Sequence, residues 1–159
     1  MRQRIALDRQ ALTVTILVTA ALLFLCAMPL WFPLSTLWLA IPAFYRLVSL
    51  YVQAPVAVVV TDDAVVIDRV IGKKRTPLAD IERVERMPRP DLSWRLMGSG
   101  GFMGYWGLFR SRTLGRFHAY VGRPRQSVLL LLRQGRPVVF SCADPDAMCA
   151  LLRQRLGKG

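Results

Sequence analysis

The sequence predicts a transmembrane hairpin of two helices, followed by a mainly-β domain of about seven antiparallel strands that one C-terminal α-helix caps. Three observations predict this fold class. Residues 11–52 form an almost uncharged apolar block, residues 53–141 alternate β-branched runs with turn residues, and residues 144–157 carry helix-capping side chains at both ends. We therefore divide the chain into a basic cytosolic N-terminus (residues 1–10), the hairpin (11–52) and a cytosolic domain (53–159).

The apolar block is long enough for two membrane crossings. A bilayer core about 30 Å thick needs roughly 20 apolar helical residues per crossing. Residues 11–28 carry no charge, and residues 34–52 carry only Arg46. The segment 29–33 begins and ends with proline, which predicts a tight loop between two helices. Pro42 weakens the second helix, and Arg46 is expected near an edge of the bilayer, because a charge at the centre costs about 3 kcal/mol.

Three other structures could contain such a block. A cleaved signal peptide has a basic start, but its apolar core of about 7–15 residues precedes a polar chain, whereas hydrophobicity resumes here after residue 33. A soluble pair of core helices would have to be wrapped on all sides by the roughly 107 residues that follow. A re-entrant hairpin that returns to the same leaflet stays open as an alternative, and it would leave the topology unchanged.

Charge sets the expected orientation. Arg2, Arg4 and Arg9 precede the first helix, and a basic domain follows the second. Because positive charge stays preferentially on the cytoplasmic side, both chain ends are expected in the cytosol, with the hairpin in the membrane. The formal charge of the chain is +12, and residues 83–125 hold nine arginines against two acidic residues. The domain itself is therefore basic.

Short β-branched runs predict the strands. The first hairpin joins residues 56–61 to 64–70 across Asp62-Asp63. Pro77 favours an edge position for the strand that contains it. Residues 128–132 are all apolar, which is typical of a strand buried on both faces. Further strand-like segments lie at residues 75–78, 81–86, 94–109, 114–121, 127–133 and 136–141.

The segment 94–109 is unusual because glycines alternate with large aromatic and methionine side chains. We interpret its glycines as structural, since glycine in a strand marks a bulge, a sharp bend or a close backbone approach. A dinucleotide-binding Gly-x-Gly-x-x-Gly motif would need glycine at Met103, and no βαβ pattern surrounds the segment. The structural glycines are Gly98, Gly100, Gly101, Gly104 and Gly107.

The end of the chain predicts a helix. Asp144 is suited to the N-cap, Pro145 to the first helical position and Gly157 to the termination. An apolar stripe on one face is expected to cover an open end or face of the sheet. This stripe consists of Met148, Leu151, Leu152 and Leu156.

No pattern predicts an enzyme, a cofactor or a metal site. His118 is the only histidine, which excludes a multi-histidine metal site. The acidic pairs Asp62-Asp63 and Asp144/Asp146 are explained by turn and cap chemistry. The three cysteines show no Cys-x-x-Cys spacing, and we interpret them as unpaired thiols in a reducing compartment.

Two basic clusters are the candidate lipid- or partner-binding residues. They surround two predicted turns and comprise Arg110, Arg112, Arg116, Lys73, Lys74 and Arg75. A domain tethered closely to a bilayer holds basic turns near anionic headgroups, where each charge gains about 1 kcal/mol. We expect the arginine cluster, Arg110, Arg112 and Arg116, to face the membrane. An ordinary solvated surface is the alternative, and a nucleic-acid surface is not expected because anchoring already explains the charge.

The domain resembles the bacterial pleckstrin-homology (PH)-like domain family over residues 54–156. The resemblance rests on glycine, aromatic and Asp-Pro spacing in the segments Arg95–Phe109, Leu114-Gly115, Tyr120 and Ser141–Pro145. It implies a split, strongly bent antiparallel barrel that the helix closes at one end, and many relatives similarly follow a transmembrane hairpin. It brings no catalytic residues. The turn Asp62-Asp63 is acidic where phosphoinositide-binding relatives are basic, which weighs against inositol-lipid binding there.

These observations predict a membrane-anchored, non-enzymatic adaptor or scaffold. It would present its basic domain at the cytosolic membrane surface to a protein partner, with anionic phospholipid as a second ligand. The alternative is an accessory subunit of a membrane transporter or membrane enzyme, which would pack against its partner through the hairpin.

Overall fold

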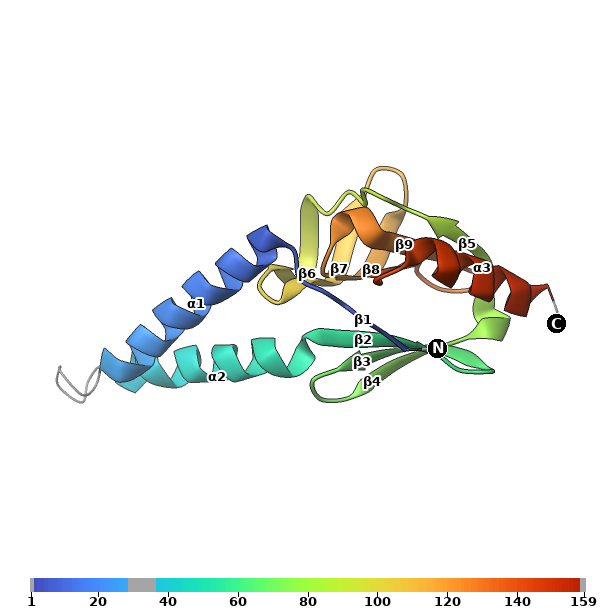
Figure 1. The fold of residues 1–159 in the computed structure, drawn as a ribbon. Coiled ribbons are helices and arrows are strands. Elements are labelled where there is room, and N and C mark those ends of the chain that lie inside the picture. Colours follow the sequence, from blue (N-terminus) through green and yellow to red (C-terminus); the bar gives the residue numbers. More distant parts are fainter. Residues whose placement is uncertain (1, 29–36, 158–159) are drawn as a thin grey trace.

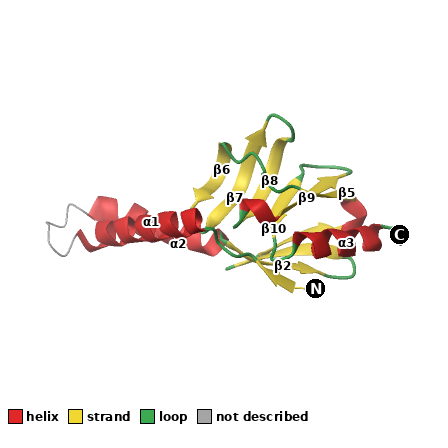
Figure 2. Ribbon diagram, turned by 45° about the horizontal axis from the view of Figure 1, so that its top comes forward, coloured by secondary structure: helices red, strands yellow, loops and turns green. Residues whose placement is uncertain are grey.

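A computed structural model of the protein describes residues 2–28 and 37–157 and shows a helical hairpin attached to a β domain (Figure 1). The domain contains two sheets and one packed helix (Figure 2). The helices are α1 (Arg9–Ala27), α2 (Leu37–Gln53) and α3 (Pro145–Leu156). The strands are β1 (Arg2–Arg4), β2 (Pro55–Val60), β3 (Ala64–Arg69), β4 (Lys73–Pro77), β5 (Ile81–Arg86), β6 (Trp94–Gly101), β7 (Gly104–Ser111), β8 (Gly115–Val121), β9 (Ser127–Leu132) and β10 (Val138–Ser141).

The first sheet has four antiparallel strands in the order β1-β2-β3-β4. The predicted hairpin across Asp62-Asp63 is confirmed as β2 and β3. Thr61 closes its turn, because its Oγ1 accepts a hydrogen bond from Ala64 N–H at 3.1 Å and donates one to the Asp63 carboxylate at 2.9 Å. Pro77 ends β4, and β4 is an edge strand, as the missing N–H of proline predicts.

The N-terminal residues belong to this sheet. β1 pairs with β2 in the register Arg2↔Val59, so the basic N-terminus that the sequence sets apart is joined to the domain. The chain then continues along the domain, where Ile5 N–H donates to Val56 O at 2.9 Å. The Ile5 side chain belongs to the main core, the larger cluster of buried side chains, to which both sheets contribute. Composition alone conceals this strand, because three residues with two arginines carry no β signal.

The second sheet has six strands in the order β5-β9-β10-β8-β7-β6. It corrects the expectation of about seven antiparallel strands, since the described residues form ten and one pair, β8 with β10, is parallel. The cause lies in the connection after β8. Residues 122–126 include a short 3-10 turn and carry the chain past the strand position next to β8, so that β9 forms one position further along the sheet. Strand β10 then fills the position between β8 and β9.

Strand β9 is buried on both faces, as its apolar run predicts. Val128 and Leu130 join the core between the two sheets, whereas Leu129 joins a second core on the opposite face with Phe109 and Phe117. Neighbouring positions of a strand point to opposite faces, so an uninterrupted apolar run serves both cores.

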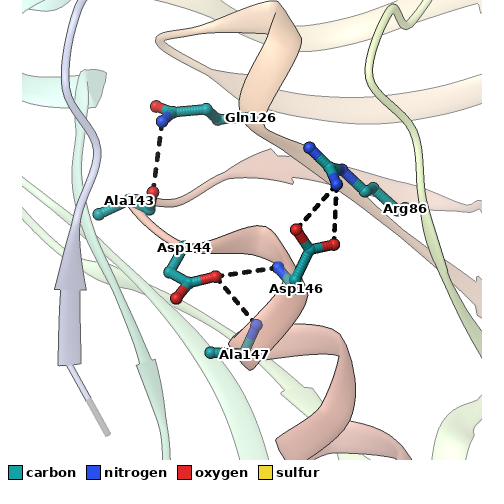
Figure 3. Close-up of polar contacts among 6 residues, drawn as sticks. All are labelled: Arg86, Gln126, Ala143, Asp144, Asp146 and Ala147. Atoms are coloured by element: carbon teal, nitrogen blue, oxygen red, sulfur yellow. Dashed lines mark hydrogen bonds and ion pairs between the residues drawn. The ribbon is translucent and has the colours of Figure 1, made fainter.

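Helix α3 is also as predicted. The Asp144 carboxylate accepts hydrogen bonds from the N–H groups of Asp146 and Ala147 at 3.1 and 3.0 Å, which makes Asp144 the N-cap (Figure 3). Met148 and Leu152 are fully buried and pack the helix on the main core beside β5 and β9. Arg86 of β5 makes an ion pair with Asp146 at 2.8 Å and ties the first turn to the sheet (Figure 3).

Helices α1 and α2 lie side by side and project from the domain (Figure 1). Within the described residues, α1 has the length and hydropathy of a membrane span, with 11% of that span buried. Helix α2 has 17 residues, contains Pro42 and does not qualify by length. A helical pair is therefore observed, whereas two crossings remain a prediction. The predicted loop at residues 29–33 lies outside the described residues.

Candidate binding surface

The arginine cluster occupies the turn between β7 and β8. Arg110 and Arg116 are opposite each other in the pairing of these strands, and Arg112 lies in the connecting turn. The Ser111 hydroxyl oxygen accepts a hydrogen bond from Leu114 N–H at 2.9 Å, which stabilises the turn. All three arginines are exposed, so the turn presents three guanidinium groups to solvent.

A hollow of about 390 Å³ lies beside this turn. Its lining includes Trp94, which is 66% exposed at the start of β6, and Asp91. Hydrogen bonds from Ser93 lower the pKa of Asp91, and the charge of Arg112 lowers it further. The hollow therefore combines an aromatic ring, guanidinium groups and one ionised carboxylate, a combination suited to an anionic polypeptide with apolar side chains.

The arginine cluster points away from the helical hairpin. Strand β7 begins at Gly104, beside α1, and runs to the arginine turn at its other end (Figure 1). Six residues of strand separate Gly104 from Arg110, or about 20 Å at 3.4 Å per residue. These arginines therefore lie at the end of β7 remote from the hairpin, and their role in lipid or partner binding stays a prediction. Strand direction, which turn composition does not report, decides which turn lies beside the hairpin.

The basic residues of β4 do not form a single site. Arg75 makes an ion pair with Asp63, and Lys74 lies close enough to His118 to affect its protonation. Burial lowers the pKa of His118, and the charge of Lys74 lowers it further. Lys73 is exposed at the start of β4, beside the end of α2. The six predicted basic residues thus lie in two places. The three arginines lie at the β7–β8 turn, and the three basic residues of β4 each have a different environment.

Three of the five glycines carry a clear structural requirement. Gly98 and Gly107 are opposite each other in β6 and β7, with φ values of 108° and 120°. A Cβ on Gly98 would lie 2.1 Å from the Trp106 carbonyl oxygen, and one on Gly107 would lie 2.2 Å from that of Met97. Gly104 has a φ of 92°, and a Cβ there would lie 2.8 Å from the Val121 carbonyl oxygen. All three positions therefore need glycine. Gly101 also has positive φ, whereas Gly100 has neither that backbone nor a close backbone neighbour.

No pattern in the sequence indicates how the hairpin joins the domain. The Thr15 hydroxyl of α1 accepts a hydrogen bond from Met103 N–H in the β6–β7 turn at 2.7 Å. The ring of Phe102, in the same turn, meets the ring of Tyr51 edge-on at 5.2 Å, and the Tyr51 hydroxyl hydrogen-bonds Thr19 at 3.1 Å. These contacts attach both helices to one turn of the six-stranded sheet, so hairpin and domain form a continuous unit.

Metal-ligating and thiol side chains are scattered in the described part of the chain. Residues 2–28 and 37–157 contain no group of three or more His, Cys, Asp or Glu side chains that could hold a metal ion. Cys142 and Cys149 are free, buried thiols, and Cys149 lies within α3. Burial raises the pKa of Cys142 to about 12, so that thiol is a poor nucleophile near neutral pH.

Comparison with known proteins agrees with the fold. The sequence model of the family described as bacterial PH domain matches residues 56–156, from β2 to the end of α3. The chain belongs to this family. No curated protein and no solved structure gives a significant match. A bacterial PH domain indicates a binding or adaptor role, and PH-like domains are generally non-catalytic. The hairpin and β1 lie outside the matched region.

Proposed function

We propose that this bacterial PH-domain protein is a membrane-anchored, non-enzymatic adaptor. Its hairpin holds the domain at the cytosolic face of the inner membrane, and its arginine cluster binds an acidic segment of a protein partner. The observation that carries the proposal is the pairing of β1 with β2, because these strands flank the hairpin on its two sides in the sequence.

This pairing restricts the topology. Residues 2–4 precede α1 and residues 55–60 follow α2, yet both lie in one sheet. The chain must therefore leave the domain through α1 and return through α2 on the same side of a membrane. A single crossing by α1 is incompatible with this sheet, which supports a hairpin that crosses twice or re-enters the same leaflet. The excess of arginine and lysine at this side favours the cytosol.

The surface of the hairpin favours lipid over water. Burial of a large apolar side chain stabilises by about 1.5–3 kcal/mol, so eleven such side chains in water represent a large unfavourable free energy. They lie on both helices, which a contact with one helix alone would not cover. The exposed apolar side chains are Leu12, Val14, Ile16, Leu17, Leu23, Phe24, Trp38, Ile41, Phe44, Tyr45 and Val48.

The position of the arginine cluster favours a protein partner over the headgroups of the anchoring membrane. The cluster lies up to about 20 Å beyond the junction with the hairpin, and the Debye length at physiological ionic strength is about 8 Å. At that separation roughly a tenth of the surface potential remains. Trp94 beside the cluster adds an apolar contact of the kind that protein interfaces use.

Membrane anchoring is tested on the full chain in native membranes. We expect the protein to resist alkaline carbonate extraction and reporters fused to either end to be active only in the cytosol. Extraction into the soluble fraction would refute the anchor, and a C-terminal reporter active only in the periplasm would refute the orientation. Stoichiometric co-purification of a transporter or membrane enzyme, unaffected by loss of the arginine cluster, would favour the accessory subunit instead.

The partner surface is tested by a charge-matched comparison. Proteins crosslinked to the parent in native membranes are compared with those crosslinked to the triple variant R110A/R112A/R116A and to the control R125A/R133A/R136A. The control removes three exposed arginines from other turns. We expect a specific acidic protein to be lost from the first variant alone. Equal crosslinking to all three chains would refute the arginine surface.

A further inference from the structure

The turn between β3 and β4 is attached to the end of α2. Val70 N–H donates to Ala54 O and Ile71 N–H donates to Val52 O, both at 3.0 Å. These bonds satisfy carbonyl groups at and just beyond the C-terminus of α2, which would otherwise lack partners. They also fix the position of the turn along the axis of α2, because Ile71 must lie beside Val52.

The tip of this turn is apolar although nothing in the described chain covers it. The Val70 side chain is 50% exposed and that of Ile71 is 65% exposed, and Gly72 follows with a φ of 87°. Lys73 is exposed directly after the tip. An apolar tip followed by a basic residue is the combination that the boundary between headgroups and acyl chains accommodates, because the apolar side chains enter and the ammonium group remains among the phosphates.

The other charges next to the tip contact groups within the domain. Arg69 donates through Nη2 to the Tyr120 hydroxyl at 3.0 Å and lies over its ring, although its buried Nε has no hydrogen-bond partner among the described residues. Asp68 makes an ion pair with Arg2 at 3.6 Å and has a side chain only 17% exposed. Lys73 therefore gives the exposed tip its positive character.

The attachment of this tip to α2 supports a position at the membrane. The described part of α2 spans about 26 Å, from seventeen residues at 1.5 Å each, somewhat less than the roughly 30 Å of a hydrocarbon core. With α2 in the proposed anchor, its C-terminal end lies near the boundary of the acyl region, and the β3–β4 turn is attached there. Arg46 lies about 10 Å before that end, within reach of the same headgroups.

We propose that Val70, Ile71 and Lys73 form a second membrane contact, in which the β3–β4 turn enters the headgroup region of the leaflet from which the hairpin emerges, with Lys73 beside anionic phosphates. This contact rests on the proposed anchor and adds to it. It would hold the domain in one orientation, with the arginine cluster directed into the cytosol. In this orientation Lys73, one of the six basic residues predicted from sequence, contacts lipid, whereas the arginine cluster does not.

The test uses the full chain in nanodiscs of phosphatidylcholine and phosphatidylglycerol. An environment-sensitive fluorophore is attached to V70C, I71C or D62C, the last as the matched control at the opposite end of β3. The parent, carrying only its native cysteines, measures background labelling. We expect blue-shifted emission at positions 70 and 71 with strong quenching by lipids that carry a nitroxide near the headgroup, and polar, unquenched emission at position 62.

The outcomes separate this proposal from the anchor. If positions 70 and 71 behave like position 62 while the protein still resists carbonate extraction, the turn does not enter the membrane and the anchor stands. If the protein is extracted, the anchor and the turn contact both fail. Quenching at position 70 that disappears on addition of I71D to V70C, with position 62 unchanged on addition of I71D to D62C, would support the contact.

Discussion

Gly122 is expected to control whether the N-terminal segment stays on the domain. The Ala6 carbonyl oxygen would lie 2.3 Å from a Cβ at this position, and Ile5 Cγ2 would lie 2.8 Å from it. The Gly122 carbonyl also accepts a hydrogen bond from Asp8 N–H at 2.9 Å. Gly122 has no positive φ, so alanine there would act by steric conflict alone.

The cost of Gly122→Ala follows from these distances. An ordinary Cβ contact begins at 3.4 Å, so the Ala6 carbonyl must retreat by about 1 Å. Overpacking of this kind costs about 1–3 kcal/mol, and loss of the adjacent Asp8 hydrogen bond adds about 1 kcal/mol. The total of about 2–4 kcal/mol can be relieved if residues 2–8 leave the sheet. Their open state should therefore be populated at least about 30-fold more than in the parent.

Hydrogen exchange measured by mass spectrometry on the full chain tests this prediction. In G122A, the peptide containing Ile5 and Asp8 should lose protection, while peptides from β9 and α3 keep theirs. G100A is the matched control, because a Cβ on Gly100 meets only the Arg95 side chain at 3.5 Å or more. Parent-like protection of the N-terminal peptide in G122A would refute the packing argument, and loss of protection in G100A would show that the method does not discriminate.

Three further changes have defined outcomes. Thr15→Val removes the acceptor of Met103 N–H and should destabilise the junction by about 1–2 kcal/mol, seen as faster exchange in the β6–β7 turn; unchanged exchange would contradict that role. Asp144→Ala removes the N-cap of α3 and should cost about 1 kcal/mol in denaturant unfolding, whereas Asp144→Asn should cost less. Burial and the charge of Lys74 hold the pKa of His118 below its ordinary 6.5, so the unfolded chain binds its proton first and stability should fall as pH drops below about 6.5. The variant H118Q should lose this dependence, and an identical pH profile would refute it.

Local chemistry in the sequence was sufficient to predict several structural elements. The capping residues of α3, the Asp62-Asp63 hairpin and the edge position of Pro77 were all predicted, because each depends on a residue's own backbone preferences and hydrogen-bonding groups. The apolar run in β9 likewise predicted a strand buried on both faces. The glycine, aromatic and Asp-Pro spacing pointed to the PH-like family, which the match over residues 56–156 confirms.

Only the tertiary structure decided strand order, the place of the N-terminus and the direction of each turn. The pairing of β1 with β2 joins residues more than 50 positions apart, and no short-range pattern in Arg2–Arg4 encodes it. The parallel pairing of β8 with β10 depends in the same way on a connection that passes over one strand position. Side-chain composition identified both basic turns, but a turn's distance from the hairpin depends on strand direction. That direction emerges when apolar faces from distant segments pack into a common core, so the sequence determined which turns are basic and the fold determined which of them adjoins the hairpin.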